Sequence, residues 1–248
     1  MSNRELLDTI EMLRGKIDAG KLIIFVGAGV SKNVTGMPDW YQLVKAMADK
    51  IGYSRCTSCR NKTDNCTKDC KFQDAYTQDE YLKIPQYVYN ADPDLYDQLL
   101  KENISDAEYD VPLSNVIFSL NPAHIITTNF DKLIESSSHP ARANYEVIIR
   151  DSDLLKATKR KYIIKMHGDI APENRKDIVL KESDFLEFSQ RHVLIELFVK
   201  ALLADHTILF LGYSMNDYNI KLIISWLNYI RVQNKDTCCL LPDRTFLT

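Results

Sequence analysis

Four short apolar runs of this sequence are each followed by small or polar residues that could carry chemistry. These segments are Gly27-Ala28-Gly29-Val30-Ser31, Thr127-Thr128-Asn129-Phe130-Asp131, Met166-His167-Gly168-Asp169 and Gly212-Tyr213-Ser214-Met215-Asn216-Asp217. Glycine and alanine let a backbone approach a phosphate closely, and the N–H groups that follow can donate to it. An asparagine can hold a hydroxyl group or a water, and a histidine with an ordinary pKa of about 6.5 suits proton transfer near neutral pH.

Each segment also has a purely structural interpretation. The glycines could form a tight strand-to-helix turn, because Lys32 occupies the place of the third glycine of the G-x-G-x-x-G fingerprint. Asn129 and Asp131 could cap a helix, since both residue types are common N-caps. His167 alone could equally be a buried structural histidine. The functional interpretation therefore depends on the combination of the four segments.

The pattern of the elements predicts where these segments lie. Apolar runs predict strands at Leu22–Val26, His124–Thr128, Tyr145–Ile149, Tyr162–Met166, His206–Leu211 and Thr237–Leu241. Helical patterns predict helices before Gly20, after Trp40, near Asp79–Asn90, Asp94–Glu102, Leu113–Leu120, Asp153–Ala157, Arg191–Ala204 and Asn216–Arg231, and one that starts at Phe130. Alternating strands and helices predict an α/β fold with a parallel, doubly wound sheet. Ligands bind such sheets outside the carboxyl ends of the strands, where all four segments fall.

Length and composition describe one domain over residues 1–248, with a mostly helical, cysteine-bearing module inserted at residues 52–110. The 31 Lys and Arg against 34 Asp and Glu leave a formal charge of −3, so we expect no direct binding to nucleic acid. The apolar runs are shorter than the roughly 18 residues of a membrane span, and we expect no membrane association. No secretory leader pattern precedes Gly20, which predicts a cytoplasmic protein.

Four cysteines fall within fifteen residues, as Cys56, Cys59, Cys66 and Cys70. Their spacing is compatible with a tetrahedral zinc site, and thiols are normally reduced in the cytoplasm. The alternative is an exposed loop with four unused thiols, which would be prone to oxidation. We expect one structural Zn²⁺ bound by these four residues.

The four segments, taken in order, resemble the sirtuin (SIR2) family. The similarity runs from about residue 20 to about residue 241 and is closer to the SIR2-like domains of bacterial anti-phage defence proteins than to deacetylating sirtuins. Thr128 stands where sirtuins usually have Gln, and the segments Pro38-Asp39-Trp40, Ile84-Pro85-Gln86 and Gly212-Tyr213 with Asp217 are of the defence type. The sirtuin zinc module follows His-Gly and has a longer spacer, so the cysteine cluster lies outside the resemblance.

The resemblance implies a Rossmann-like fold that binds NAD⁺ as substrate. It implies that Asn129 and His167 form the catalytic pair and that Asp131 is the acid near the nicotinamide amide. The implied NAD⁺-binding residues are Gly27, Ala28, Gly29, Ser31, Asp39, Trp40, Thr128, Gly212, Tyr213, Ser214 and Asp217. The first four of these would line the pyrophosphate, and Gly212, Tyr213 and Ser214 would lie near the adenosine-side ribose.

The activity that the resemblance implies is an NAD⁺ glycohydrolase, which depletes cellular NAD⁺ during abortive infection. One alternative is a protein deacylase or ADP-ribosyltransferase, which would need an acceptor for turnover. Another is a non-catalytic module that senses NAD⁺ or drives oligomerisation within a defence complex. The resemblance also implies a homo-oligomer and a regulatory partner such as an ATPase or an Argonaute-type protein.

Overall fold

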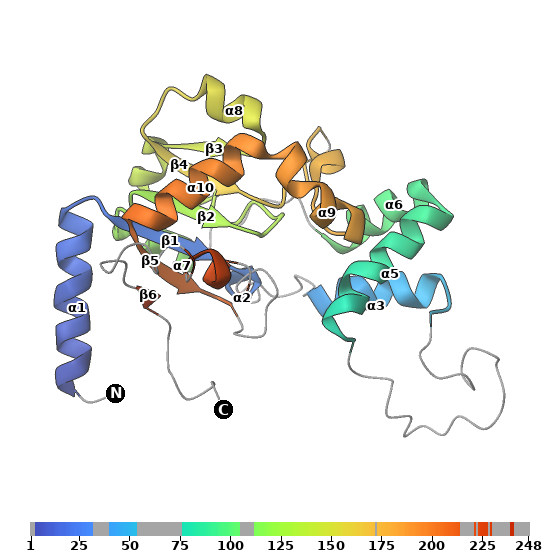
Figure 1. The fold of residues 1–248 in the computed structure, drawn as a ribbon, viewed down its shortest axis with the longest axis horizontal. Coiled ribbons are helices and arrows are strands. Elements are labelled where there is room, and N and C mark those ends of the chain that lie inside the picture. The colour runs from blue at the N-terminus through green and yellow to red at the C-terminus, as the bar shows by residue number, and fades with distance from the viewer. Residues whose placement is uncertain are drawn as a thin grey trace.

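The computed structural model describes residues 3–31, 40–53, 76–104, 112–171, 173–213, 221, 223–227, 229 and 239–240. Within these residues one six-stranded sheet has the order β3-β4-β2-β1-β5-β6, and every neighbouring pair of strands is parallel (Figure 1). The strands are β1 (Leu22–Val26), β2 (His124–Thr127), β3 (Tyr145–Ile148), β4 (Lys161–Lys165), β5 (Thr207–Leu211) and β6 (Cys239–Leu240). The α/β fold and the parallel sheet that the sequence predicts are confirmed.

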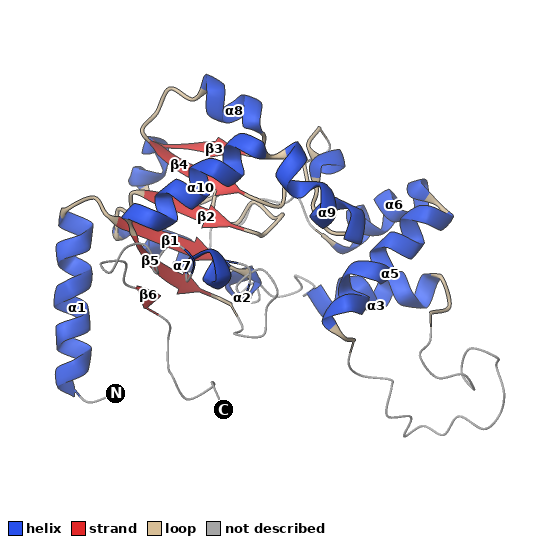
Figure 2. Ribbon diagram, viewed as in Figure 1, coloured by secondary structure: helices blue, strands red, loops and turns tan. Residues whose placement is uncertain are grey.

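Helices cover both faces of the sheet, which explains why the strands are apolar on both sides (Figure 2). Along β1, Ile23 and Phe25 belong to the apolar cluster that includes α10 (Val193–Asp205), whereas Ile24 and Val26 belong to the cluster that includes α7 (Pro112–Ser119). The helices around the sheet are α1 (Asn3–Asp18), α2 (Ala28–Ser31), α7 (Pro112–Ser119), α8 (Asp151–Lys156), α9 (Glu182–Arg191) and α10 (Val193–Asp205). Two short 3₁₀ turns occupy Pro140–Asn144 and Arg175–Asp177.

Three further helices form a separate layer beyond the carboxyl ends of the strands (Figure 1). They are α3 (Trp40–Lys50), α5 (Gln78–Ala91) and α6 (Pro93–Asn103). Their buried residues share an apolar cluster that also contains Phe130, Ile170 and Leu180 from the loops at the strand ends. This helical layer therefore packs directly on the loops that carry the candidate site. The division of the chain at residues 52 and 110 stays a prediction.

The strand order singles out the carboxyl ends of β1 and β5 as the expected ligand position. From β1 the chain builds β2, β3 and β4 on one side of the sheet and then returns to place β5 on the other side of β1. The loops that follow β1 and β5 therefore leave the sheet side by side, at the point where the order of strand addition reverses, and ligands of such folds bind at this switch point. None of the described helices is both long and apolar enough to cross a bilayer.

The predicted helix that starts at Phe130 is wrong. Residues 131–136 form bends and a turn, in which the Asp131 carboxylate accepts from the N–H of Leu133 at 3.0 Å. The Lys165 ammonium also binds the carbonyls of Phe130 and Asp131, which a helix would need for its own hydrogen bonds. The sequence pattern also missed α9, and the predicted helix at Asn216–Arg231 lies largely outside the described residues.

Candidate active site

The loops after β1 and β5 pack against each other through glycines. Gly212 has a φ of +73°, and a Cβ atom there would lie 2.6 Å from the Val30 nitrogen. A Cβ atom on Gly29 would lie 2.6 Å from the Gly212 oxygen, and one on Gly27 would lie 2.7 Å from the Tyr213 ring. The Gly29 N–H donates to the Gly212 carbonyl at 2.7 Å. The sequence places glycine at these three positions because no larger residue allows this contact.

The same bonds occupy the donors of the glycine segment. The N–H groups of Gly27, Gly29 and Val30 donate to the carbonyls of Leu211, Gly212 and Gly27. The glycines thus hold the loop after β1 against the loop after β5 through backbone hydrogen bonds. Ala28, between them, is exposed at the first position of α2.

A buried chain of hydrogen bonds joins the loop after β1 to the loop after β2. The Asn129 Nδ2 group donates to the Gly27 carbonyl at 3.1 Å and to the Ser31 Oγ atom at 3.0 Å. Ser31 Oγ in turn donates to the Asp131 Oδ2 atom at 2.6 Å. All three side chains are buried. Asn129 and Asp131, predicted from sequence as functional residues, therefore meet through the serine of the glycine segment.

Thr128 and Tyr213 form a second link, which joins the loop after β2 to the loop after β5. Their hydroxyl groups lie 2.8 Å apart, and the Tyr213 hydroxyl donates to the Val26 carbonyl at 3.1 Å. The Tyr213 ring also packs on Phe25, with 5.6 Å between the ring centroids. Two residues predicted to bind NAD⁺ thus contact each other at the ends of β1, β2 and β5.

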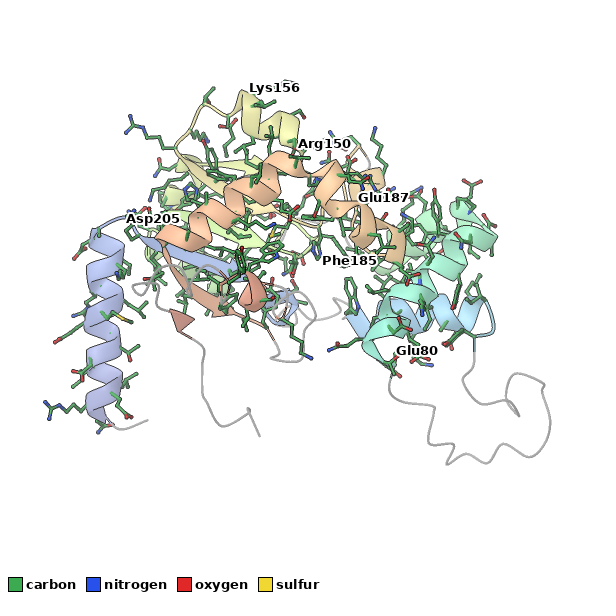
Figure 3. The ribbon with its side chains drawn as sticks, viewed as in Figure 1. Glu80, Arg150, Lys156, Phe185, Glu187 and Asp205 are labelled. Carbon is green, nitrogen blue, oxygen red and sulfur yellow. The ribbon has the colours of Figure 1, made fainter. Side chains whose placement is uncertain are left out.

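His167 follows β4 and is buried against aromatic rings. Its ring centroid lies 5.3 Å from that of Phe185 on α9, edge to face, and its Nδ1 atom is buried with no hydrogen-bond partner among the described residues. Figure 3 labels Phe185 on the side of α9 that faces the strand ends. Burial, with the nearby His192 ring adding to it, lowers the pKa of His167 to about 3. His167 is therefore a neutral imidazole at physiological pH.

Gly168 lets the chain turn sharply behind this histidine. Its φ is +88°, and a Cβ atom would lie 2.6 Å from the Asp177 carbonyl oxygen. The His167 carbonyl accepts from the N–H of Val179 at 2.9 Å, so the segment at residues 177–179 holds the loop from outside.

Lys165 is a buried cation at this edge that the sequence interpretation overlooked. It is the last residue of β4, and its side chain is completely inaccessible. Its Nζ atom lies 2.7 Å from Glu135 Oε1 and 2.6 Å from Asp169 Oδ2. A signal was present, because a lysine at the end of an apolar run with an aspartate four positions later is unusual for a buried strand.

The remaining predicted residues divide into those that the structure places and those outside the described part. The Trp40 ring, at the start of α3, packs on Phe130 with 5.8 Å between centroids, next to Asn129 in the sequence. The predicted residues outside the described part are Asp39, Ser214, Asp217, Cys56, Cys59, Cys66 and Cys70. In the part that the structure describes, no group of three or more His, Cys, Asp or Glu side chains is arranged to hold a metal ion.

Comparison with known proteins gives a consistent result. Residues 123–245 match the family model described as the SIR2-like domain. The chain is 34% identical to defense-associated sirtuin 2 of Bacillus subtilis over 239 residues, which are 96% of this chain and 22% of that protein. It is 29% identical to the NAD(+) hydrolase ThsA of Cytobacillus dafuensis over 215 residues, 85% of this chain and 39% of that protein. It is 26% identical to the NAD(+) hydrolase ThsA of Bacillus cereus (strain MSX-D12) over 231 residues, 89% of this chain and 43% of that protein. The chain thus spans less than half the length of these relatives.

Proposed function

We propose that this chain, whose residues 123–245 match the SIR2-like domain, is an NAD⁺ hydrolase that cleaves NAD⁺ to nicotinamide and ADP-ribose. The observation that carries this proposal is the buried hydrogen-bond chain of Asn129, Ser31 and Asp131 at the carboxyl edge of the sheet. The names of the ThsA relatives, which are NAD(+) hydrolases, support the same activity.

The chemistry of the bond defines what the site must do. Nicotinamide in NAD⁺ is already cationic, so it leaves from C1′ of the ribose as a neutral molecule without a proton from an acid. The ribose then resembles an oxocarbenium ion, as in glycoside hydrolysis, and water adds to C1′. Rate acceleration therefore depends on the orientation of the ribose and the control of one water, which are tasks for positioned polar groups.

Asn129 is the residue we assign to that orientation. Its two amide hydrogens are held by the Gly27 carbonyl and by Ser31 Oγ. The Oδ1 atom is therefore the part of this amide that accepts from a ribose hydroxyl or from the attacking water. Asp131, fixed by Ser31 and by its own turn, supplies the negative charge that we assign to the nicotinamide end.

We assign to His167 the role of accepting a proton from a ribose hydroxyl or from the attacking water. Burial keeps the imidazole neutral, so one ring nitrogen carries no proton and can accept a hydrogen bond from a ribose hydroxyl or from the attacking water. The same burial lowers the basicity of His167, so proton transfer to it requires that the bound substrate raise its pKa from the value of the free protein. The glycine segment, with Ala28, is assigned to close backbone approach to the pyrophosphate, because the N–H groups of Gly27, Gly29 and Val30 already donate within the protein. Gly212, Tyr213 and Ser214 are assigned to the adenosine-side ribose, and Asp39, Trp40, Thr128 and Asp217 to the rest of the NAD⁺ site.

The activity is tested with NAD⁺ alone, without a peptide or other acceptor. Wild-type protein should release nicotinamide and ADP-ribose in equal amounts, which chromatography separates and quantifies. Asn129→Ala should lose most of this activity, whereas Asn90→Ala, on the exposed surface of α5, should retain it. Equal release by wild type and Asn129→Ala would contradict the assignment, and a strict requirement for an acceptor would indicate a transferase or deacylase instead.

We place this activity in anti-phage defence, where it would deplete the NAD⁺ of an infected cell. Defense-associated sirtuin 2 of Bacillus subtilis, by its name, supports that context. We also propose a cytoplasmic homo-oligomer controlled by a partner protein, for example an ATPase or an Argonaute-type protein. Leu6, Leu7 and Ile10 on α1 are exposed at 44%, 59% and 37%, which supports an intersubunit contact there. Light scattering of wild type and of Leu7→Glu tests the assembly, and equal masses would contradict this contact.

We propose separately that Cys56, Cys59, Cys66 and Cys70 bind one structural Zn²⁺. The support is their sequence spacing and the oxidation risk of four free thiols in one segment. Metal analysis of protein purified without added zinc should find about one zinc per chain. A Cys59→Ser/Cys66→Ser variant should lose it, and absence of zinc from the wild type would contradict the proposal.

A further inference from the structure

Lys165 is unusual because it places a full charge inside a parallel sheet. Its side chain has no accessible surface, and it lies in β4 between β2 and β3. Removing an ammonium group from water costs several kcal/mol, so the group persists only where oxygens replace the lost water. A residue with this cost, next to the candidate site, calls for a specific explanation.

Oxygens of two different loops replace that water. From the loop after β2, the carbonyls of Phe130 and Asp131 accept from Lys165 Nζ at 3.2 and 2.5 Å. The Glu135 carboxylate, in the same loop, lies 2.7 Å away. From the loop after β4, the Asp169 carboxylate accepts at 2.6 Å. The ammonium therefore joins the segment that contains Asn129 to the segment that contains His167.

The pairing of β2 with β4 places Lys165 close to the loop after β2. Thr127, the last residue of β2, pairs with Lys165 in β4. The catalytic candidates Asn129 and His167 each lie two residues beyond this pair. A side chain that starts at Lys165 thus reaches the backbone immediately after Asn129, at the point where both loops leave the sheet.

Lys165 is also connected, through Asp131, to the hydrogen bonds that join Ser31 and Asn129. Asp131, whose carbonyl binds Lys165, uses its carboxylate to accept from Ser31, and Ser31 accepts from Asn129. Asp169, on the other side, accepts from the Ala171 N–H at 2.7 Å, which fixes the turn after His167. The ammonium remains charged: burial favours loss of its proton, but the Glu135 and Asp169 carboxylates outweigh this and raise the pKa of Lys165.

We infer that Lys165 is a positioning residue for NAD⁺ cleavage, whose buried ammonium holds the Asn129 loop and the His167 loop in the arrangement needed at C1′ of the ribose. The inference rests on the proposed function for its chemical role. Its structural part, the joining of the two loops, can be measured without turnover.

The test must separate positioning from folding. Lys165→Met alone leaves two buried carboxylates without a cation and could fail to fold. Lys165→Met/Glu135→Gln removes one charge of each sign, so the cluster keeps its formal charge of −1. Lys161→Met is the matched control. Lys161 is the first residue of β4, at the end of the strand away from the site, and its ammonium binds Asn121 and Pro122.

Two readouts decide the inference. Displacement of the reacting groups by about 1 Å can cost about 100-fold in rate, so kcat for NAD⁺ should fall by roughly 10- to 100-fold in the double variant while KM changes by less. Hydrogen exchange should accelerate in residues 129–136 and 167–171 of the double variant. Lys161→Met should change neither quantity.

The outcomes remain distinguishable from those of the proposed function. If wild type releases no nicotinamide, the hydrolase proposal fails, and hydrogen exchange still decides whether Lys165 joins the loops. If wild type is active and the folded double variant keeps the wild-type kcat, the inference on Lys165 is overturned. Unchanged exchange in both loops overturns it as well.

Discussion

Ser31 Oγ donates to Asp131 Oδ2 at 2.6 Å, across 100 residues of sequence, in a buried part of the site. This bond connects the loop after β1 to the loop after β2. The same hydroxyl oxygen accepts from the Asn129 amide, so one serine fixes both polar residues that follow β2.

Replacing Ser31 tests this connection directly. In Ser31→Ala the Asp131 carboxylate loses a buried donor and the Asn129 amide loses an acceptor, so we expect a loss of about 1–3 kcal/mol in the free energy of unfolding. The kcat for NAD⁺ should fall by roughly tenfold or more, because the Asn129 amide then keeps only its bond to the Gly27 carbonyl and is less well oriented. Urea unfolding and steady-state kinetics measure the two effects. Ser119→Ala, at an exposed position of α7, is the control, and a similar response of both variants would refute the assigned role.

The glycine contact makes a second prediction. Gly212→Ala places a Cβ atom 2.6 Å from the Val30 nitrogen at a φ of +73°, so the loops after β1 and β5 must separate. We expect a loss of about 1–3 kcal/mol in the free energy of unfolding and weaker NAD⁺ binding by calorimetry.

Gly15→Ala is the matched control for that substitution. Gly15 lies within α1, where an added Cβ atom has no neighbour within 4 Å. Because alanine favours helix more than glycine does, this variant should be stabilised by about 0.5–1 kcal/mol. A Gly212→Ala protein with wild-type stability and NAD⁺ affinity would show that the loops tolerate separation.

The buried state of His167 predicts an unusual pH profile. Because burial lowers its pKa to about 3, His167 stays neutral between about pH 5 and pH 8. The value of kcat/KM for NAD⁺ should therefore show no limb near pH 6.5 that depends on this residue. The comparison is a profile of wild type against a slower but measurable His167→Gln variant. A limb near pH 6.5 that disappears in His167→Gln would mean that the imidazole titrates in the free enzyme.

His124, at the start of β2, predicts a pH dependence of stability. Burial, with His206 and Lys161 contributing, lowers the pKa of His124 to about 4, and its ring stacks on Tyr162. The unfolded chain binds a proton below about pH 6.5, whereas the folded protein binds one only below about pH 4. The free energy of unfolding contributed by this group is thus complete above pH 6.5 and decreases as the pH falls toward 4, by roughly 3 kcal/mol at most.

Urea unfolding at several pH values measures this dependence. His124→Gln should flatten the decrease between about pH 6.5 and pH 4, whereas replacement of the partly exposed His139 should leave it in place. An unchanged slope in His124→Gln would assign the pH dependence to other groups, such as His167 or His192.

Much of the fold could be predicted because the strands are apolar on both faces and are separated by helical patterns. The predicted strands at β1, β2, β4 and β5 agree with the structure to within one or two residues. The helix predicted from Phe130 failed for a tertiary reason. Lys165, thirty-five residues further along, binds the carbonyl of Phe130, and no local pattern around Phe130 contains that information.

The sequence by itself determined which residues come to the carboxyl edge, because parallel strands end on the same side and four of the strands are followed by segments of small or polar residues. Asn129, Asp131, His167 and the glycines could be named from that rule and from the resemblance. Only the tertiary structure decided how they are connected. Ser31 joins Asn129 to Asp131, Gly212 packs on Gly29, and Lys165 lies buried between two loops. These contacts depend on strand order and on the loss of water around a charge, and both arise only when distant segments pack together.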